Sequence, residues 1–360
     1  MIPIIDLLND PPARQADLIK QALGTVGFFE VRNASLSAQH IDTMFTSMRE
    51  LFDLAPGDKA EYPADDVGSG YIPPRAQALG LEKRDHRETF QYGRNAAKRA
   101  QPLPYPWKAN THATKGLSDF HRDLHHISER LLELFALALE LPFEHFRKAH
   151  SFGLNTGLSM IHYPSLTAEE RNGVASIDIR AGEHKDWGTL TMLFQKPGGE
   201  PGLQVYLPRS ALSSDSTSSP GTDTVNNSEY PTQGDWAWYD APVPPPGGFL
   251  VNVGLAMELW SGGAYKATLH RVIFPQPSTH HAERLPDRYT FAYFVQPDDE
   301  VEIQPVLQDG KVDLSVSAIR AGELFGSKLR ESMERSKRMH MLPASLTARQ
   351  DGLGSEGVLV

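Results

Sequence analysis

The feature that most constrains this fold is a change of hydrophobic period near residue 157 of the 360-residue chain. Before this point, apolar residues recur three and four positions apart, which is the spacing of one helix face. After it come short runs rich in β-branched and aromatic residues, each bounded by glycine, proline or asparagine: GLSMIHYP, HKDWGTLTMLFQ, GLQVYLP, DWAWYDAP, GGFLVNVG, KATLHRVIFP and RYTFAYFVQP. Such runs without intervening helices indicate an antiparallel sandwich or jelly roll.

The first third of the chain is expected to be helical around a short strand candidate at residues 2–7. Ser37 is a candidate N-cap for the apolar stripe that follows it. The helical stripes cover residues 18–26, 41–52, 115–141 and 318–338. We therefore expect a mainly β protein with a helical surround and a C-terminal helix.

The chain divides into three regions on this interpretation. Residues 1–150 form an N-terminal helical region, residues 151–300 the jelly-roll core, and residues 301–360 a C-terminal extension with a helix. Within the core, residues 208–233 are rich in Ser, Thr, Asn and Pro and nearly free of apolar side chains. This insert is expected to be a mobile surface loop.

Composition removes several classes of function. The absence of cysteine excludes disulfides, thiolate nucleophiles, zinc ribbons and iron–sulfur clusters, so a metal must bind to His, Asp or Glu. A net charge of −10 without a long basic cluster argues against nucleic acid as a partner. No apolar run reaches the roughly 18 residues that cross a bilayer, and the N-terminus lacks signal-peptide features, so we expect no membrane association and a cytoplasmic location.

Fourteen histidines make a histidine-based metal site the first hypothesis to test. The pattern H-x-D occurs at residues 40–42, 121–123 and 184–186. On a helix, residues two apart point about 200° away from each other, and the first two patterns lie within helical stripes. On a strand, residues two apart share a face, and the third pattern opens a strand-like run. Only His184 and Asp186 are therefore expected to converge on one ion.

His121 and His125 have the i,i+4 spacing of zinc metalloproteases, but Arg122 stands where that motif needs a glutamate base. His145 and His150 are five apart, which does not fit the motif. We interpret these four histidines mainly as polar or surface residues, with metal binding by the first pair as the alternative.

A third ligand should come from another strand, and His270 in KATLHRVIF is the best placed. Two imidazoles and one carboxylate on one face of a metal leave adjacent positions open, which suits non-haem Fe(II) enzymes that use O₂. The alternative is a hydrogen-bonded histidine of the core.

In RYTFAYF, strand alternation places Arg288, Thr290, Ala292 and Phe294 on one face. A guanidinium with a hydroxyl two residues later suits a carboxylate held in a closed pocket. The alternative is an arginine on an exposed edge strand.

Taken in order, IPIIDL, GFFEV, HYP, GEHKDWGTLTMLFQ, GLQV, HRV and RYTFAYF resemble the isopenicillin-N-synthase-like branch of the Fe(II)/2-oxoglutarate-dependent dioxygenases, over residues 1–297. Within this branch the chain resembles the fungal thymine-hydroxylase-type enzymes, through its HYP, RAGEH-x-D, LFQ and RYT-x-AYF strings. The resemblance implies a double-stranded β-helix of the jelly-roll class.

The resemblance also implies roles for single residues. His184, Asp186 and His270 match the iron ligands, and Arg288 with Thr290 matches the pair that binds the distal carboxylate of 2-oxoglutarate. Tyr163 matches a tyrosine that contacts the same co-substrate. Two positions depart from the family pattern, namely Ile161 in place of asparagine and Leu255 in place of aspartate. They leave the orientation of the co-substrate in question.

The implied reaction uses Fe(II), 2-oxoglutarate and O₂ to oxidise a small molecule, with release of succinate and CO₂. Trp187 and Phe294 are candidates for an aromatic substrate pocket, with core packing as the alternative. Two other functions stay open: an Fe(II) oxidase or cyclase that uses no 2-oxoglutarate, and a non-catalytic jelly-roll binding protein. The substrate and the oligomeric state cannot be inferred from the residues.

Overall fold

The computed structural model describes residues 2–65, 69–77, 79, 85–92, 111–152, 154–167, 179–211, 235–274, 284–307 and 310–341. The α-helices are α1 (Pro12–Thr25), α2 (Ala38–Phe52), α3 (Pro56–Ala60), α4 (Thr111–Ala138), α6 (Leu255–Trp260) and α7 (Ala321–Met341). The strands are β1 (Ile4–Asp6), β2 (Phe28–Arg32), β3 (Gly70–Ile72), β4 (Glu88–Tyr92), β5 (Gly157–Tyr163), β6 (Leu166–Thr167), β7 (Ile179–His184), β8 (Leu190–Gln195), β9 (Leu203–Pro208), β10 (Trp236–Asp240), β11 (Phe249–Val253), β12 (His270–Ile273), β13 (Arg284–Leu285), β14 (Arg288–Val295), β15 (Glu302–Ile303) and β16 (Ile319–Arg320).

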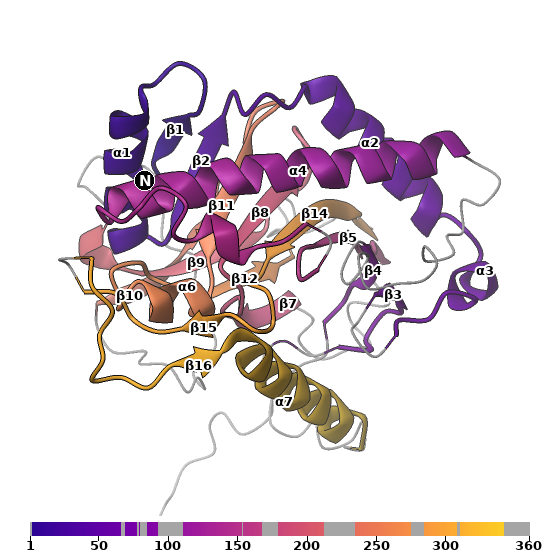
Figure 1. Cartoon of the computed structure of the whole chain (residues 1–360). Helices are drawn as coiled ribbons and strands as arrows, with labels where there is room; N and C mark the ends of the chain where they lie inside the picture. Colours follow the sequence, from indigo (N-terminus) through magenta and orange to yellow (C-terminus); the bar gives the residue numbers. More distant parts are fainter. Residues whose placement is uncertain are drawn as a thin grey trace, which may run out of the picture.

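Two sheets form the barrel of the molecule. The larger sheet has the order β1-β2-β11-β8-β14-β5-β4-β3, and the smaller has the order β10-β9-β12-β7. Within these sheets every pairing is antiparallel except that of β1 with β2. Helix α4 lies across the larger sheet, with α1 and α2 beside it (Figure 1). The jelly roll surrounded by helices is confirmed.

The larger sheet is buried on both faces because helices cover one and the smaller sheet the other. On β11, Phe249 and Val251 pack with the helices, whereas Leu250 joins an apolar cluster with residues of the smaller sheet. That second cluster, called the barrel interior here, includes Tyr163, Ala181, Val205, Val272 and Ala292. Because alternate residues of a strand enter two different apolar clusters, both faces are buried and the strand sequences are almost continuously apolar.

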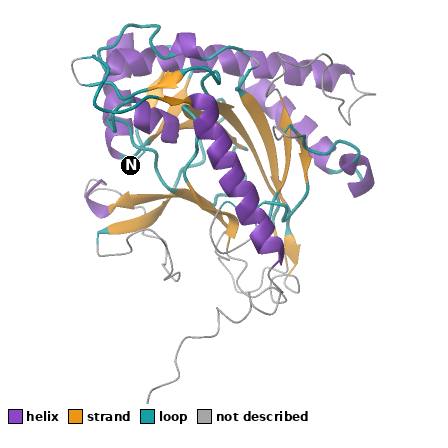
Figure 2. Ribbon diagram, turned by 60° about the horizontal axis from the view of Figure 1, so that its bottom comes forward, coloured by secondary structure: helices purple, strands orange, loops and turns teal. Residues whose placement is uncertain are grey.

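The helices agree well with their sequence patterns. Ser37 caps α2 by accepting a hydrogen bond from the backbone N–H of His40 at 3.0 Å. The stripe at residues 115–141 lies in α4 up to Ala138, and the C-terminal stripe lies in α7 from Ala321 onward. Helix α7 crosses in front of the sheets in Figure 2.

The first 92 residues contain more strand than expected. Most of the GFFEV segment lies in β2, residues 88–92 (ETFQY) form β4, and both strands extend the larger sheet. A five-residue segment is too short for its pattern to separate a buried strand from part of a helix. Here pairing with neighbouring strands of the larger sheet favours the strand. The division into three regions stays a prediction.

The insert at residues 208–233 joins two neighbouring strands. Pro208 at the end of β9 lies opposite Trp236 at the start of β10, so the insert connects adjacent strand ends. Most of the insert lies outside the described residues, so its expected mobility stays a prediction.

Among the helices in the described ranges, none combines the length and apolar character that a membrane span requires.

Candidate metal centre

Three side chains that are distant in sequence meet at one end of the barrel. His184 ends β7 and lies directly opposite His270, which begins β12, and their rings are 4.3 Å apart between centroids. Asp186 follows two residues after β7. The ligand atoms of these three residues lie within 4.8 Å of one another. In the part of the chain that the structure describes, this is the one such group of three.

Each of these side chains uses its other polar atom to fix its orientation. His184 Nδ1 donates to the carbonyl of Gly182 at 2.7 Å, and His270 Nδ1 donates to the carbonyl of Thr268 at 3.0 Å. Nδ1 of both rings is thus occupied, which leaves Nε2 as the candidate metal-binding atom, and each Nε2 lies 3.8 Å from Asp186 Oδ1.

Two further residues hold the carboxylate of Asp186. Its Oδ2 accepts a hydrogen bond from Thr191 Oγ1 at 2.7 Å and another from Asn252 Nδ2 at 2.8 Å. Oδ1 is thus left facing the two imidazoles. Asn252 lies on β11 and Thr191 on β8, so the larger sheet supports a ligand set whose histidines come from the smaller sheet.

The pKa values of His184 and Asp186 are shifted in the directions that suit metal ligands. Burial, together with the neighbouring His270, lowers the pKa of His184 to about 3, so its imidazole is neutral. Burial opposes ionisation of Asp186, but the two imidazoles and the bonds from Asn252 and Thr191 outweigh it and lower its pKa. Two imidazoles and one carboxylate on one side of a point fit a non-haem Fe(II) ion.

A buried guanidinium in the same barrel marks a candidate pocket for a carboxylate. Arg288 is 3% exposed on the central strand β14, which excludes an exposed edge strand. Its Nη2 donates to Gln195 Oε1 at 2.8 Å, and its guanidinium carbon lies 5.1 Å from the centre of the Tyr163 ring. Arg288 Nε and Thr290 Oγ1 are buried without a hydrogen-bond partner. Donors left without acceptors in a closed site fit a carboxylate ligand.

Two residues of this pocket were not predicted. Gln195 stands in the LFQ string, where alternation along β8 places it on the same face as Thr191. Arg180 is fully buried on β7, and its Nη2 donates to the carbonyl of Pro286. The RAGEH string contains Arg180, but nothing in the string shows that its side chain is buried.

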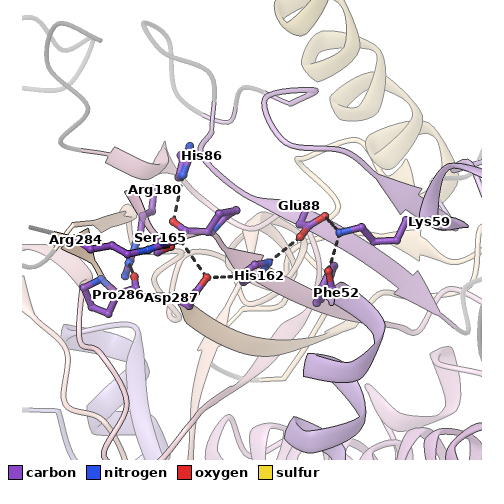
Figure 3. Close-up of polar contacts among 11 residues, drawn as sticks. Phe52, Lys59, His86, Glu88, His162, Ser165, Arg180, Arg284, Pro286 and Asp287 are labelled. Atoms are coloured by element: carbon purple, nitrogen blue, oxygen red, sulfur yellow. Dashed lines mark hydrogen bonds and ion pairs between the residues drawn. The ribbon is translucent and has the colours of Figure 1, made fainter. Parts of the chain in front are cut away.

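A chain of charged residues runs from the buried Lys59 and Glu88 through His162 to the exposed Asp287, the residue before Arg288 (Figure 3). His162 Nε2 lies 2.7 Å from Asp287 Oδ1, and its Nδ1 lies 2.7 Å from Glu88 Oε1. Lys59 Nζ donates to Glu88 Oε2 at 2.9 Å. Burial opposes a charge on His162, but Asp287 and Glu88 outweigh burial and raise its pKa. The network links β4 and β5 to the residue that precedes β14.

The other candidate histidines do not join a metal site. His121, His125 and His150 are buried, so the interpretation as surface residues is wrong for these three. His121 packs on Tyr293 of β14, and both His121 and His125 contact Phe152. His150 Nε2 lies 2.8 Å from Thr189 Oγ1. Burial lowers the pKa of His121 to about 4, so it stays neutral. The other H-x-D patterns lie on α2 and α4, as expected.

The two aromatic candidates for the substrate pocket lie apart. Phe294 packs against the barrel interior, on the face of β14 that was predicted to point inward. Trp187 packs against the core beneath the helices instead. They therefore contact different apolar clusters, and the role of each in substrate binding stays a prediction.

Comparison with known proteins gives two family matches. Residues 2–112 match the family described as non-haem dioxygenase in morphine synthesis N-terminal, and residues 212–297 match the 2OG-Fe(II) oxygenase superfamily. Among curated relatives, a UPF0676 protein of Schizosaccharomyces pombe is 26% identical and covers 91% of each chain. A 2-oxoglutarate-dependent dioxygenase of Aspergillus rugulosus is 27% identical and covers 79% of this chain and 82% of its own.

Solved structures share the fold. A fungal thymine hydroxylase of Neurospora crassa, solved with α-ketoglutarate and 5-formyluracil, has a TM-score of 0.71 at 23% identity and covers 91% of this chain and 95% of its own. A 2OG-Fe(II) oxygenase family protein of Caulobacter crescentus has a TM-score of 0.70 at 24% identity, with coverage of 92% and 99%. The two family matches, the shared fold and the His/Asp/His group agree: the chain belongs to the 2OG-Fe(II) oxygenase superfamily.

Proposed function

We propose that the chain oxidises a small molecule with Fe(II), 2-oxoglutarate and O₂, and that His184, Asp186 and His270 bind the iron. The observation that carries this proposal is the convergence of their ligand atoms within 4.8 Å, with the remaining polar atom of each side chain already bonded. Support of this kind by surrounding groups is typical of metal sites.

Arg288, Thr290 and Tyr163 would hold the distal carboxylate of 2-oxoglutarate. The unpartnered Nε of Arg288 and the hydroxyl of Thr290 supply donors, and Gln195 fixes the guanidinium by accepting from Nη2. Bound Fe(II) would supply the reductive activation of O₂. The apolar barrel interior excludes water, and the fixed side chains orient the reactants.

The first experiment measures succinate. Purified protein with Fe(II), 2-oxoglutarate and a panel of small metabolites is expected to form succinate together with an oxidised product. The panel should include thymine, because the Neurospora crassa enzyme was also solved with it. Succinate formation separates the oxygenase from an oxidase on the same scaffold, and absence of Fe(II) binding would favour a non-catalytic binding protein.

A second experiment tests Arg288. Removing one partner of a buried charged pair costs about 2 to 5 kcal/mol, which is roughly a 30- to 5000-fold loss of binding. Arg288→Ala is therefore expected to weaken 2-oxoglutarate binding at least 30-fold, about the lower of these limits. Arg288→Lys should restore part of it, because an ammonium lacks the planar fork. The measurement titrates 2-oxoglutarate into the anaerobic Fe(II) protein and follows the metal-to-ligand absorption band. Unchanged affinity in Arg288→Ala would favour the oxidase.

Three expectations remain proposals beside this function. The substrate is a small molecule, the protein acts in the cytoplasm, and the chain is organised as an N-terminal helical region, a jelly-roll core and a C-terminal extension.

A further inference from the structure

A second buried guanidinium lies in the barrel without a role in the chemistry proposed above. Arg180 has no exposed surface, and its Nη2 donates to the carbonyl of Pro286. Its Nε and Nη1 are buried and have no hydrogen-bond partner. Since Nε carries one N–H and Nη1 carries two, three strong donors lack acceptors.

An irregularity in the sheet directs this side chain. Opposite β12, Val272 pairs with Ala181, but the next residue, Ile273, pairs with Ile179. Arg180 is thus the extra residue of a β-bulge on β7. Bulges re-aim a side chain that regular alternation would place on the other face. Ala181 and Val272 both belong to the barrel interior.

Aromatic rings contact the Arg180 guanidinium, and the carboxylates of Glu200 and Asp287 act on its charge from a distance without pairing with it. Its guanidinium carbon lies 4.7 Å from the centre of the Phe274 ring and 6.0 Å from that of Tyr163, and both rings are buried. Figure 3 shows Arg180 beside Pro286, just before the start of β14. No described carboxylate forms an ion pair or hydrogen bond with it.

Arg288 lies against the same Tyr163 ring, so two buried cations share one wall of the barrel. Burial and then the nearby charge of Arg288 lower the pKa of Arg180 to about 10, which leaves it charged at neutral pH. A buried charge without a counterion destabilises a protein. A ligand that brings negative charge would remove that cost.

We propose that Arg180 binds a carboxylate group of a small-molecule ligand inside the barrel, beside Arg288. The inference rests on the proposed function, because Arg288 is taken there to bind one end of 2-oxoglutarate. The carboxylate belongs either to 2-oxoglutarate, shared between both arginines, or to the substrate. In the second case the substrate is an organic acid.

The test compares Arg180→Met with Arg180→Lys and with a control, Arg284→Met. Arg284 lies on the neighbouring strand β13 and is exposed, with its Nε donating to Ser165 Oγ at 2.7 Å. Each protein is melted without ligand. Arg180→Met removes a charge at similar volume, so its melting temperature should equal or exceed that of the wild type.

The first arm titrates 2-oxoglutarate into each anaerobic Fe(II) protein by calorimetry. The carboxylate is assigned to 2-oxoglutarate if Arg180→Met loses at least tenfold in affinity and Arg180→Lys recovers part of that loss. The control Arg284→Met should bind 2-oxoglutarate as the wild type does. The second arm adds acetate to protein saturated with Fe(II) and 2-oxoglutarate and follows the melting temperature. Saturable stabilisation of the wild type that is lost in Arg180→Met assigns the carboxylate to the substrate.

The proposal is overturned if 2-oxoglutarate affinity and the acetate effect are both unchanged in Arg180→Met, whatever its melting temperature. That result would mean that Arg180 only supports the carbonyl of Pro286. If the wild type itself does not bind 2-oxoglutarate, the proposed function fails. The acetate arm is then run on ligand-free protein, where a saturable effect lost in Arg180→Met supports the site and its absence overturns it.

Discussion

At the scale of residues, the metal centre depends on atoms that would not touch the metal. Asn252 and Thr191 both bond Oδ2 of Asp186, and backbone carbonyls accept from the Nδ1 atoms of His184 and His270. The candidate ligands His184 and Asp186 were predictable because the other two H-x-D patterns lie on helices, although Asp186 follows the end of β7 and does not itself lie on a strand. His270 was predicted separately, from its place in the β region. Asn252 was not, since its role depends on the pairing of β11 with β8.

Asp186→Ala is expected to abolish Fe(II) binding and turnover while leaving the fold largely intact, because it removes the one anionic ligand. Fe(II) affinity of the anaerobic protein and its melting temperature are the measurements. The control is Asp123→Ala, in an H-x-D pattern on α4, which should bind iron normally. Loss of iron binding in the control, with binding retained in Asp186→Ala, would show that the metal site is assigned wrongly.

His162 is expected to make stability depend on pH in the alkaline direction. Both of its ring nitrogens contact carboxylate oxygens at 2.7 Å, so the bonds are complete when the ring is charged. Because its pKa is raised in the folded protein, its contribution is full below the ordinary value of 6.5 and is lost as the pH rises through the raised value.

Urea unfolding between pH 6 and pH 9 measures this effect. His162→Gln should lower the free energy of unfolding by about 1.5 to 3 kcal/mol at pH 6, the range for hydrogen bonds to charged groups, and by less at higher pH. The matched control is His126→Gln, since His126 is exposed next to Glu129. If the wild type and His162→Gln lose stability in parallel over this range, His162 is not the titrating group.

At the scale of elements, period and length decided what could be predicted. The stripes of α2 and α4 are long enough to define a helix, and Ser37 marks the start of α2. The five residues of β2 or of β4 contain too little periodicity to separate strand from helix. The bulge at Arg180 was beyond prediction, because it exists only in the pairing of β7 with β12.

Deleting residues 210–232 is expected to leave turnover within about tenfold of the full chain, since loop length changes closure free energy by only about 0.6 kcal/mol per doubling. The strand ends are already adjacent, because Pro208 lies opposite Trp236 and Arg209 N–H donates to the carbonyl of Asp235 at 2.6 Å. Succinate formation and the melting temperature are the measurements. A deleted protein that folds but no longer binds substrate would identify the insert as part of the binding site.

At the scale of the whole molecule, the ordered series of motifs predicted the family, and the family matches confirm it. No single motif did so. The motifs did not predict contacts between residues that are distant in sequence, such as the network from Lys59 through Glu88 to His162. Those partners lie 29 and 74 positions apart, and no local pattern of residues encodes such a pairing.

The strand order of the larger sheet has a consequence for synthesis on the ribosome. Strand β2, near the start of the chain, pairs with β11, and the sheet is complete only after β14. At 5 to 20 residues per second, β2 waits on the order of 10 to 40 s for its partner. Nascent chains arrested before residue 288 should therefore remain sensitive to protease and bind chaperones, with protection gained only once β14 has left the tunnel.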